Sequence, residues 1–194
     1  DYAYTQTVPL TIDPYLLGLL LGDGSLGKGT LKFSNTDPVV LARLAECVRP
    51  YGLTCVPYGG CDYGLTGDGG PNLLKNALID LGLWGHNSYQ KFIPAHYLTA
   101  TRKDRMALLA GLIDTDGGVH SYASCSEPLA QGFTQLVHSL GGKATATRRT
   151  ARCQNGVSVE YTQVYWRLTE PLPLACPRKQ VNTHTRPIDY TKRI

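Results

Sequence analysis

LLAGLIDTDGG, at residues 108–118, is the stretch that indicates the fold. It begins as an apolar helix suited to a protein core and then places Asp116 directly before two glycines. A second stretch, YLLGLLLGDGS at residues 15–25, repeats the pattern and brings Asp23 to the end of another apolar run. One Asp-Gly ending is a common helix stop. Two copies in matching context predict a shared role for the two carboxylates.

Both stretches carry small residues that allow close helix packing. These residues stand four positions apart, as Gly18 and Gly22 in the first stretch and as Gly111 and Thr115 in the second. Small side chains at this spacing share one helix face and let two helix backbones approach closely. We therefore expect the two helices to pack together, which brings Asp23 and Asp116 side by side.

Two neighbouring carboxylates at helix C-termini are costly without a partner. They repel each other, and each one meets the negative end of its own helix dipole. A divalent cation removes this penalty, and Mg²⁺ prefers hard oxygen ligands of this kind. The expected metal ligands are Asp23, Asp116 and the backbone carbonyls of Gly22 and Thr115. Paired carboxylates, a metal ion and a basic surface together favour metal-assisted phosphodiester cleavage.

The predicted helices and strands occur in the same order twice along the chain. A helix, a strand pair, a second helix, a hairpin and a third helix are expected in each half, and the marker residues Asp23 and Asp116 lie 93 positions apart. This order predicts an α+β protein made of two repeats. The expected division is a connector at 1–12, a first repeat at 13–98, a second repeat at 99–182 and a connector at 183–194.

Composition and charge are those of an ordinary globular protein. Hydrophobic residues make up 42% of the chain, and no apolar run approaches the ~20 residues of a membrane span. The N-terminus lacks the regions of a signal peptide, so we expect an intracellular protein without a membrane partner. The net charge of +4 and the cluster of Arg148, Arg149 and Arg152 suit a polyanion, although such a cluster is as often a solvated face. Six cysteines without any CxxC pair predict free thiols.

The two apolar stretches resemble a known family. LAGLIDTDG at 109–117 is similar to the motif that names the LAGLIDADG homing endonucleases, and LLGLLLGDG at 16–24 resembles the variant found in endonucleases embedded in inteins. QKFIP at 90–94 resembles an intein block with a catalytic lysine before Ile-Pro. CPRKQ at 176–180 resembles its weaker counterpart in the second half. The resemblance thus extends over nearly the whole chain.

The resemblance implies a fold and an activity. The fold is a monomer of two pseudo-symmetric αββαββα repeats, with the motif helices paired at the interface and antiparallel sheets forming a saddle for double-stranded DNA. The activity is a metal-dependent double-strand break at a long asymmetric target. The catalytic residues it implies are Asp23, Asp116, Lys91 and Lys179, the lysines otherwise being phosphate contacts or surface charge. Asp114 has a leucine at the matching place in the first copy, so we expect a solvated acid without an essential role.

Strand alternation predicts which side chains face the DNA. The apolar positions Leu31, Phe33, Ala144, Ala146, Val164, Trp166 and Leu168 are expected to face the helices. The side chains expected to contact DNA are Lys28, Thr30, Lys32, Ser34, Thr145, Thr147, Arg149, Gln163, Tyr165 and Arg167. A slip of one residue in the strand register would invert each of these assignments.

Two other functions are compatible with the same sequence. One is a cleavage-inactive nucleic-acid-binding module of the maturase or regulator type, and the other is a structural insert that supports an intein splicing domain. The presence of both motif aspartates and of Lys91 favours an active enzyme. The chain begins at Asp1 and ends in TKRI, without the Cys or Ser and the His-Asn that bound an intein. We therefore expect the endonuclease segment alone, with a flanking splicing domain as a possible partner.

Overall fold

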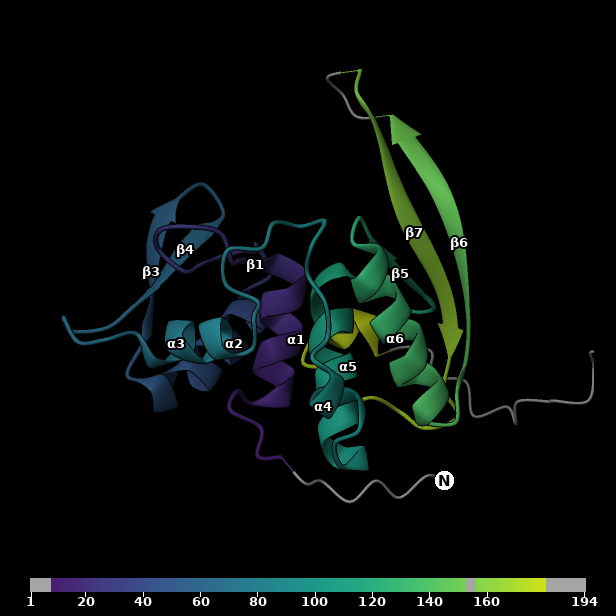
Figure 1. Cartoon of the computed structure of the whole chain (residues 1–194), viewed down its shortest axis with the longest axis horizontal. Coiled ribbons are helices and arrows are strands. Elements are labelled where there is room, and N and C mark those ends of the chain that lie inside the picture. The colour runs from purple at the N-terminus through teal and green to yellow at the C-terminus, as the bar shows by residue number, and fades with distance from the viewer. Residues whose placement is uncertain (1–7, 153–155, 181–194) are drawn as a thin grey trace, which may run out of the picture.

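The computed structural model describes residues 8–152 and 156–180 of the chain (Figure 1). Its first half contains α1 (Pro14–Asp23), β1 (Gly24–Ser25), β2 (Lys32–Ser34), α2 (Pro38–Val48), the 3-10 helix η1 (Arg49–Tyr51), β3 (Thr54–Gly59), β4 (Asp62–Thr66) and α3 (Leu73–Asp80). The short helix α4 (Ala95–Leu98) ends the first half. The second half contains α5 (Arg102–Asp116), β5 (Ser121–Ser124), α6 (Glu127–Ser139), β6 (Lys143–Arg152), β7 (Ser158–Arg167) and the 3-10 helix η2 (Pro177–Lys179).

Polar side chains cap the N-termini of four helices. The Asp13 side chain accepts a hydrogen bond from the backbone of α1, and Asp37 does the same for α2. Thr101 caps α5, and Ser126 caps α6. Each cap satisfies one of the backbone N–H groups that a helix start leaves without a partner. Asn72 caps α3 in the same way, whereas the short helix α4 follows Pro94 and has no side-chain cap.

Helices α1 and α5 lie side by side in the middle of the molecule (Figure 1). A Cβ atom added to Gly18 would lie 2.9 Å from the Cα atom of Gly111, and it would meet the Leu108 carbonyl oxygen still more closely. A Cβ atom added to Gly22 would overlap the Thr115 side chain. The predicted close contact through small residues is therefore confirmed, and any larger residue at these positions would push the helices apart.

The two halves build matching antiparallel sheets on either side of this helix pair. The first sheet has the strand order β1-β2-β4-β3, and the second has the order β5-β7-β6. Where β1 pairs with β2 through Gly24 and Phe33, the second half has only an isolated bridge between Gly117 and Tyr122. The α+β class with two sheets and a paired helix interface is confirmed.

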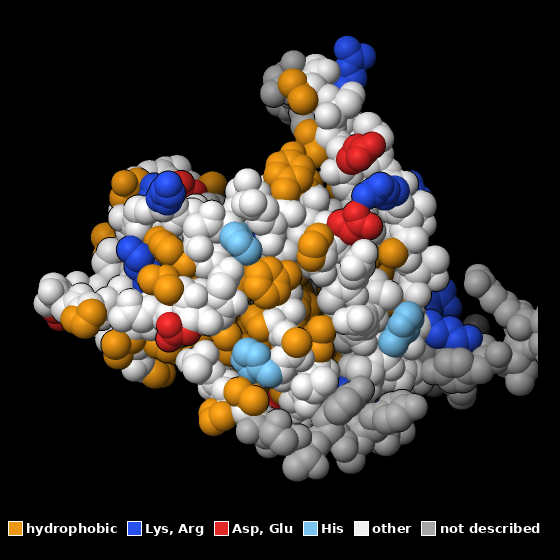
Figure 2. All heavy atoms as spheres, viewed as in Figure 1, with side chains coloured by type: hydrophobic (Ala, Val, Ile, Leu, Met, Phe, Trp, Pro, Cys, Tyr) orange, Lys and Arg blue, Asp and Glu red, His pale blue; other side chains and the backbone are white. Residues whose placement is uncertain are grey.

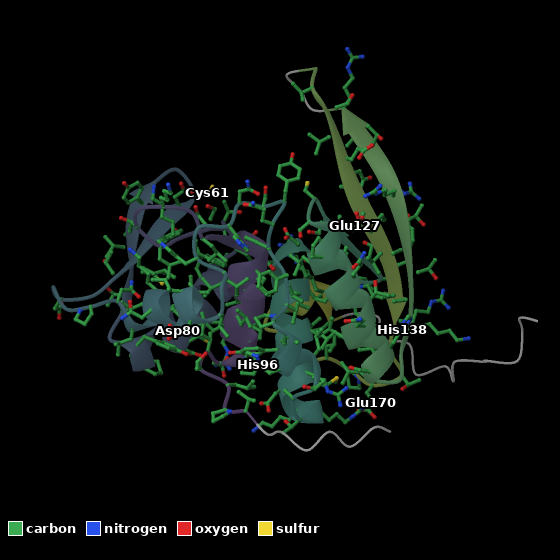
Figure 3. All side chains as sticks on the ribbon, in the orientation of Figure 1. Cys61, Asp80, His96, Glu127, His138 and Glu170 are labelled. Atoms are coloured by element: carbon green, nitrogen blue, oxygen red, sulfur yellow. The ribbon has the colours of Figure 1, made fainter. Side chains whose placement is uncertain are left out.

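The hairpin of β6 and β7 is much longer than its counterpart and projects beyond the rest of the protein (Figure 1). Val164, Trp166 and Leu168 are buried, as predicted. Ala146 shares this inner face but is exposed, because it lines a groove of about 540 Å³ between the hairpin and α6. Figure 3 shows α6 alongside the hairpin, with Glu127 and His138 labelled near its two ends.

The next features concern the cysteine side chains and the lengths of the helices. Cys47, Cys55, Cys61 and Cys176 are free thiols, as predicted, and Cys153 lies outside the described residues. Within residues 8–152 and 156–180, no helix has the length and apolar character needed to cross a bilayer.

Candidate active site

Asp23 and Asp116 are the last residues of the paired helices α1 and α5. Asp23 is half-buried and accepts a hydrogen bond of 2.5 Å from the Asn35 side-chain amide. Asp116 differs in that no donor in the described part of the chain bonds to its carboxylate. The two acids thus occupy equivalent places with different surroundings, and the sequence did not foresee the role of Asn35.

The surroundings of Asp23 and Asp116 disfavour the ionised form of both carboxyl groups. Burial raises the pKa of Asp23, and its hydrogen bond with Asn35 only partly offsets that effect. Burial against the helix pair raises the pKa of Asp116 to about 6, with the negative charge of Asp23 as the next cause. The predicted proximity of the two acids has a geometric basis, because Gly22 and Thr115, the residues directly before them, are in contact across the helix pair.

Lys91 caps the end of helix α1. The three N–H groups of its buried ammonium are shared among four backbone carbonyls, those of Leu20 at 3.3 Å, Leu21 at 2.9 Å, Gly22 at 2.9 Å and Gly24 at 2.7 Å. Burial lowers the pKa of Lys91 to about 8, although the charges of Asp116 and Asp23 act in the opposite direction. The lysine thus satisfies carbonyls at a helix end where positive charge is favourable.

Lys179 caps α5 in the same way. Its ammonium donates to the carbonyls of Ile113 at 2.7 Å, Asp114 at 2.9 Å and Thr115 at 2.9 Å. These acceptors lie 93 positions after Leu20, Leu21 and Gly22, the same spacing that separates the two marker aspartates. The structure therefore brings both predicted lysines to equivalent positions beside the carboxylates.

The capping role of the lysines was missed, although one signal for it exists. The residues after α1 and α5, Gly24 and Gly117, are extended rather than left-handed, with φ values of −75° and −89°. Neither helix has a basic residue in its last turn. A helix end that lacks both a left-handed cap residue and a basic residue in its last turn needs hydrogen-bond donors for its carbonyls from elsewhere in the chain.

The oxygen donors at this site fit a divalent cation. Asp23 and Asp116 supply two hard carboxylate ligands, the chemistry that Mg²⁺ and Ca²⁺ prefer. The carbonyls of Gly22 and Thr115, the other predicted ligands, each already accept a lysine hydrogen bond. No group of three His, Cys, Asp or Glu side chains with metal-binding placement exists among the described residues. A cation here would therefore need ligands from outside the protein, such as water or phosphate oxygens.

The prediction for Asp114 was wrong. Its side chain is buried and accepts hydrogen bonds from the Tyr15 hydroxyl at 2.8 Å and from the backbone N–H groups of Ala175 at 2.7 Å and Cys176 at 3.1 Å. It therefore connects α5 to α1 and to the segment that carries Lys179. The matching Leu21 gives no hint of this, because the contacts are remote in sequence.

The predicted DNA-facing side chains lie on the outer faces of the two sheets or in the connection before β2. Thr145, Thr147, Arg149, Gln163, Tyr165 and Arg167 share one face of the hairpin, because Thr145 pairs with Tyr165 and Thr147 pairs with Gln163. Arg149 lies over the Tyr165 ring at 5.8 Å. In the first half, Thr30, Lys32 and Ser34 alternate with buried Leu31 and Phe33, and Lys28 is exposed before them.

Several of these side chains have partners within the protein. Lys32 lies 3.6 Å from the centre of the exposed Tyr58 ring, and the Ser34 hydroxyl donates to Asp62 at 2.6 Å. Figure 2 shows Lys and Arg side chains mainly over the two sheets and the hairpin, while the middle of that face carries few charges. A cleft of about 370 Å³ opens beside the carboxylate of Asp23 and is also lined by Ser34, His86 and Lys91.

Two proteins of related sequence match most of this chain. A replicative DNA helicase DnaB from Mycobacterium intracellulare is 29% identical over 189 residues, which cover 94% of this chain and 28% of the helicase. A homothallic switching endonuclease from Saccharomyces cerevisiae is 30% identical over 167 residues, covering 71% of this chain and 28% of that endonuclease. The chain thus spans little more than a quarter of either relative. No family model matches it.

Solved structures match the chain over most of its length. Mesophilic variants of the homing endonuclease I-DmoI superpose with a TM-score of 0.54 at 13% identity, covering 81% of this chain and 89% of theirs. I-DmoI in complex with DNA and Mn matches with a TM-score of 0.52 at 12% identity, covering 80% of this chain and 89% of that one. The chain has the LAGLIDADG fold. In this LAGLIDADG fold, the paired helices bring the two aspartates together, and the loop before α4 and the turn of η2 bring the two lysines to the ends of these helices.

The raised pKa of Asp116 predicts how the stability of the metal-free protein depends on pH. The folded state holds this proton more tightly than the unfolded state, whose carboxyl titrates near 3.8. The contribution to folding stability is therefore greatest below about pH 4 and is lost as the pH rises to about 6. Urea unfolding in EDTA between pH 4 and pH 7 should show this fall in the difference between wild type and Asp116→Asn. A pH-independent difference would contradict it.

Proposed function

We propose that this protein is a site-specific DNA endonuclease that cuts both strands of a long asymmetric target. The observation that carries the proposal is the pairing of Asp23 and Asp116 at adjoining helix ends, each beside a lysine held in an equivalent position. One carboxylate and one lysine per half suit a substrate with two strands. The paired helices belong to one chain, so we propose that the active form is a monomer.

In this proposal, Asp23 and Asp116 hold divalent cations, with Mg²⁺ as the physiological ion. When bound, such an ion acts as a Lewis acid on a phosphoryl oxygen and offsets the repulsion between the carboxylates. The positive charges of Lys91 and Lys179 lie where negative charge would develop on a scissile phosphate, and such preorganised charges stabilise a transition state. Their bonds to helix carbonyls hold them there before DNA arrives.

Double-stranded DNA is the proposed partner, bound along the outer faces of the two sheets. The side chains assigned to this contact are Lys28, Thr30, Lys32, Ser34, Thr145, Thr147, Arg149, Gln163, Tyr165 and Arg167. A two-stranded ribbon fits the major groove, where polar side chains read base edges. The related fold of I-DmoI in complex with its target DNA, with Mn or Ca, supports this assignment.

We also propose that the protein is encoded within an intein. The similarity to a replicative helicase supports this origin, because the match covers 94% of this chain but only 28% of the helicase. That is the pattern expected when the matched segment is an insertion in a host protein. A splicing domain beside this segment is then the expected covalent neighbour.

Cleavage of a randomised double-stranded DNA library in Mg²⁺ tests the function directly. We expect double-strand breaks at one long sequence, absent in EDTA, and sequencing of the products would identify the target. Enrichment of bound DNA without any break would contradict the nuclease and would favour a cleavage-inactive binding module of the maturase or regulator type. Absence of both binding and cleavage would contradict both of these functions and would favour a structural insert that supports a splicing domain.

A further inference from the structure

The segments that carry the two site lysines are each in contact with the opposite half of the protein. Lys91 belongs to the first half, yet its backbone carbonyl accepts a hydrogen bond from Ser126, the N-cap of α6 in the second half. Lys179 belongs to the second half, yet its neighbours Cys176 and Arg178 contact Asp37, the N-cap of α2 in the first half. Helices α2 and α6 occupy equivalent places in the order of elements.

The Ser126 hydroxyl serves two purposes at once. It accepts the backbone N–H of Leu129 at 3.2 Å, which caps α6, and it donates to the Lys91 carbonyl oxygen at 2.5 Å. Its side chain is fully buried, so water does not replace either bond. The hydroxyl can do both because it carries a donor and acceptor lone pairs on one atom.

The two carboxylate oxygens of Asp37 have separate roles, one in capping α2 and one in contacting the second half. One oxygen accepts the backbone N–H of Val39 at 3.0 Å and caps α2. The other accepts the Cys176 thiol at 3.4 Å and forms an ion pair with Arg178 at 3.1 Å. The Arg178 guanidinium in turn donates to the Cys176 sulfur at 3.2 Å, so the turn of η2 is fixed on the side facing the first half.

We propose that Ser126 and Asp37 are positioning residues, each of which holds the site lysine of the opposite half. This inference rests on the proposed function of Lys91 and Lys179. The order of chain contacts is reciprocal: the second half fixes Lys91 at the end of α1, and the first half fixes Lys179 at the end of α5. Each site lysine is therefore positioned by a residue from the other half.

The reason for such bracing lies in the lysines themselves. Neither lysine is on a long regular element, since Lys91 lies in a loop before α4 and Lys179 ends a single turn of 3-10 helix. A long flexible side chain that must meet three or four carbonyls needs a fixed backbone. The capped N-termini of α2 and α6 are rigid points within reach and supply it.

Amide hydrogen exchange on the whole chain tests the bracing without requiring cleavage. In Ser126→Ala, we expect exchange in residues 85–91 to rise about tenfold while residues 174–180 stay unchanged, as for the loss of one buried hydrogen bond. In Asp37→Asn, which keeps an oxygen to cap α2, we expect the reverse pattern. Ser126→Thr retains the hydroxyl and should restore protection. Increases in both segments in each variant, or in neither, would overturn the proposal.

Strand-resolved nicking then tests the consequence for the site. On the target identified from the library, Ser126→Ala should slow the cutting of one strand about tenfold, and Asp37→Asn should slow the other strand. Asn72→Ala is the matched control, because it removes the cap of α3 without any contact across the halves. Equal slowing of both strands would overturn the positioning role. Absence of cleavage by the wild type would instead contradict the proposed function. The hydrogen-exchange result would then decide by itself whether Ser126 and Asp37 hold the two lysine segments.

Discussion

Replacing Asp116 by asparagine is expected to abolish double-strand cleavage while leaving DNA binding largely intact. Asparagine keeps the size of the side chain but removes the negative charge that would hold a divalent cation. Loss of metal assistance costs several kcal/mol of transition-state stabilisation, and about 4 kcal/mol corresponds to roughly a thousandfold in rate. Binding is retained because the proposed DNA contacts lie on the sheet faces, away from Asp116. Cleavage under single-turnover conditions and gel-shift binding would measure the two effects separately.

The equivalent change at Asp23 should give the same result, because both acids sit at equivalent helix ends. Asp80→Asn is a suitable control, since Asp80 is an exposed acid at the end of α3 and does not belong to the paired helices. Full double-strand cutting by either motif variant would rule out the two-carboxylate site. Loss of binding together with cleavage would show that the acids shape the protein rather than act on the substrate.

The second large effect is expected at the helix interface, where Gly111→Ala should destabilise the fold by about 3 kcal/mol. A Cβ atom at Gly111 would lie 2.9 Å from the backbone nitrogen of Leu19 and 3.0 Å from the Cα atom of Gly18. These neighbours are backbone atoms of another helix and cannot rotate away. The helix propensity of alanine, worth ~1 kcal/mol over glycine, does not offset the overlap. The midpoint of urea unfolding should fall while the slope stays constant.

Gly132→Ala provides the comparison for this interface variant. Gly132 also lies within a helix, but its added Cβ atom would meet only the Ile93 side chain, at 3.2 to 3.3 Å. A side chain can shift by a few tenths of an ångström, so the loss of stability should be clearly smaller. Equal effects at the two positions would mean that the contact between α1 and α5 is looser than the structure shows.

Local signals in the sequence were sufficient for the parts of the fold that depend on near neighbours. Asp13, Asp37, Thr101 and Ser126 were readable as helix caps because a cap acts within three residues of its own position. The spacing of Gly18, Gly22, Gly111 and Thr115 predicted the helix contact, since it records which residues share a helix face. Alternation in β7 predicted the buried positions Val164 and Trp166 correctly.

The parts that could not be predicted depend on contacts between remote segments. Asp114 was interpreted as a solvated acid because its burial is created by Ala175 and Cys176, about sixty residues later. Lys91 and Lys179 were placed beside the aspartates by resemblance alone, and the local signal for their bonds to helix carbonyls is only the lack of a basic residue in the last turn of α1 and α5. Asn35 was missed because a single amide twelve residues from Asp23 carries no signal of its own.

The reciprocal contacts between the halves have a consequence for protein engineering. Exchanging halves between relatives is an obvious route to nucleases with new target sequences, since each half carries its own sheet. Here a chimera would separate Ser126 from the loop of Lys91, and Asp37 from Cys176 and Arg178. A graft that transfers only the sheet and its DNA-facing side chains would keep both pairs together. Modular redesign of this chain should therefore cut within the halves, at the ends of the strands, rather than at the boundary between them.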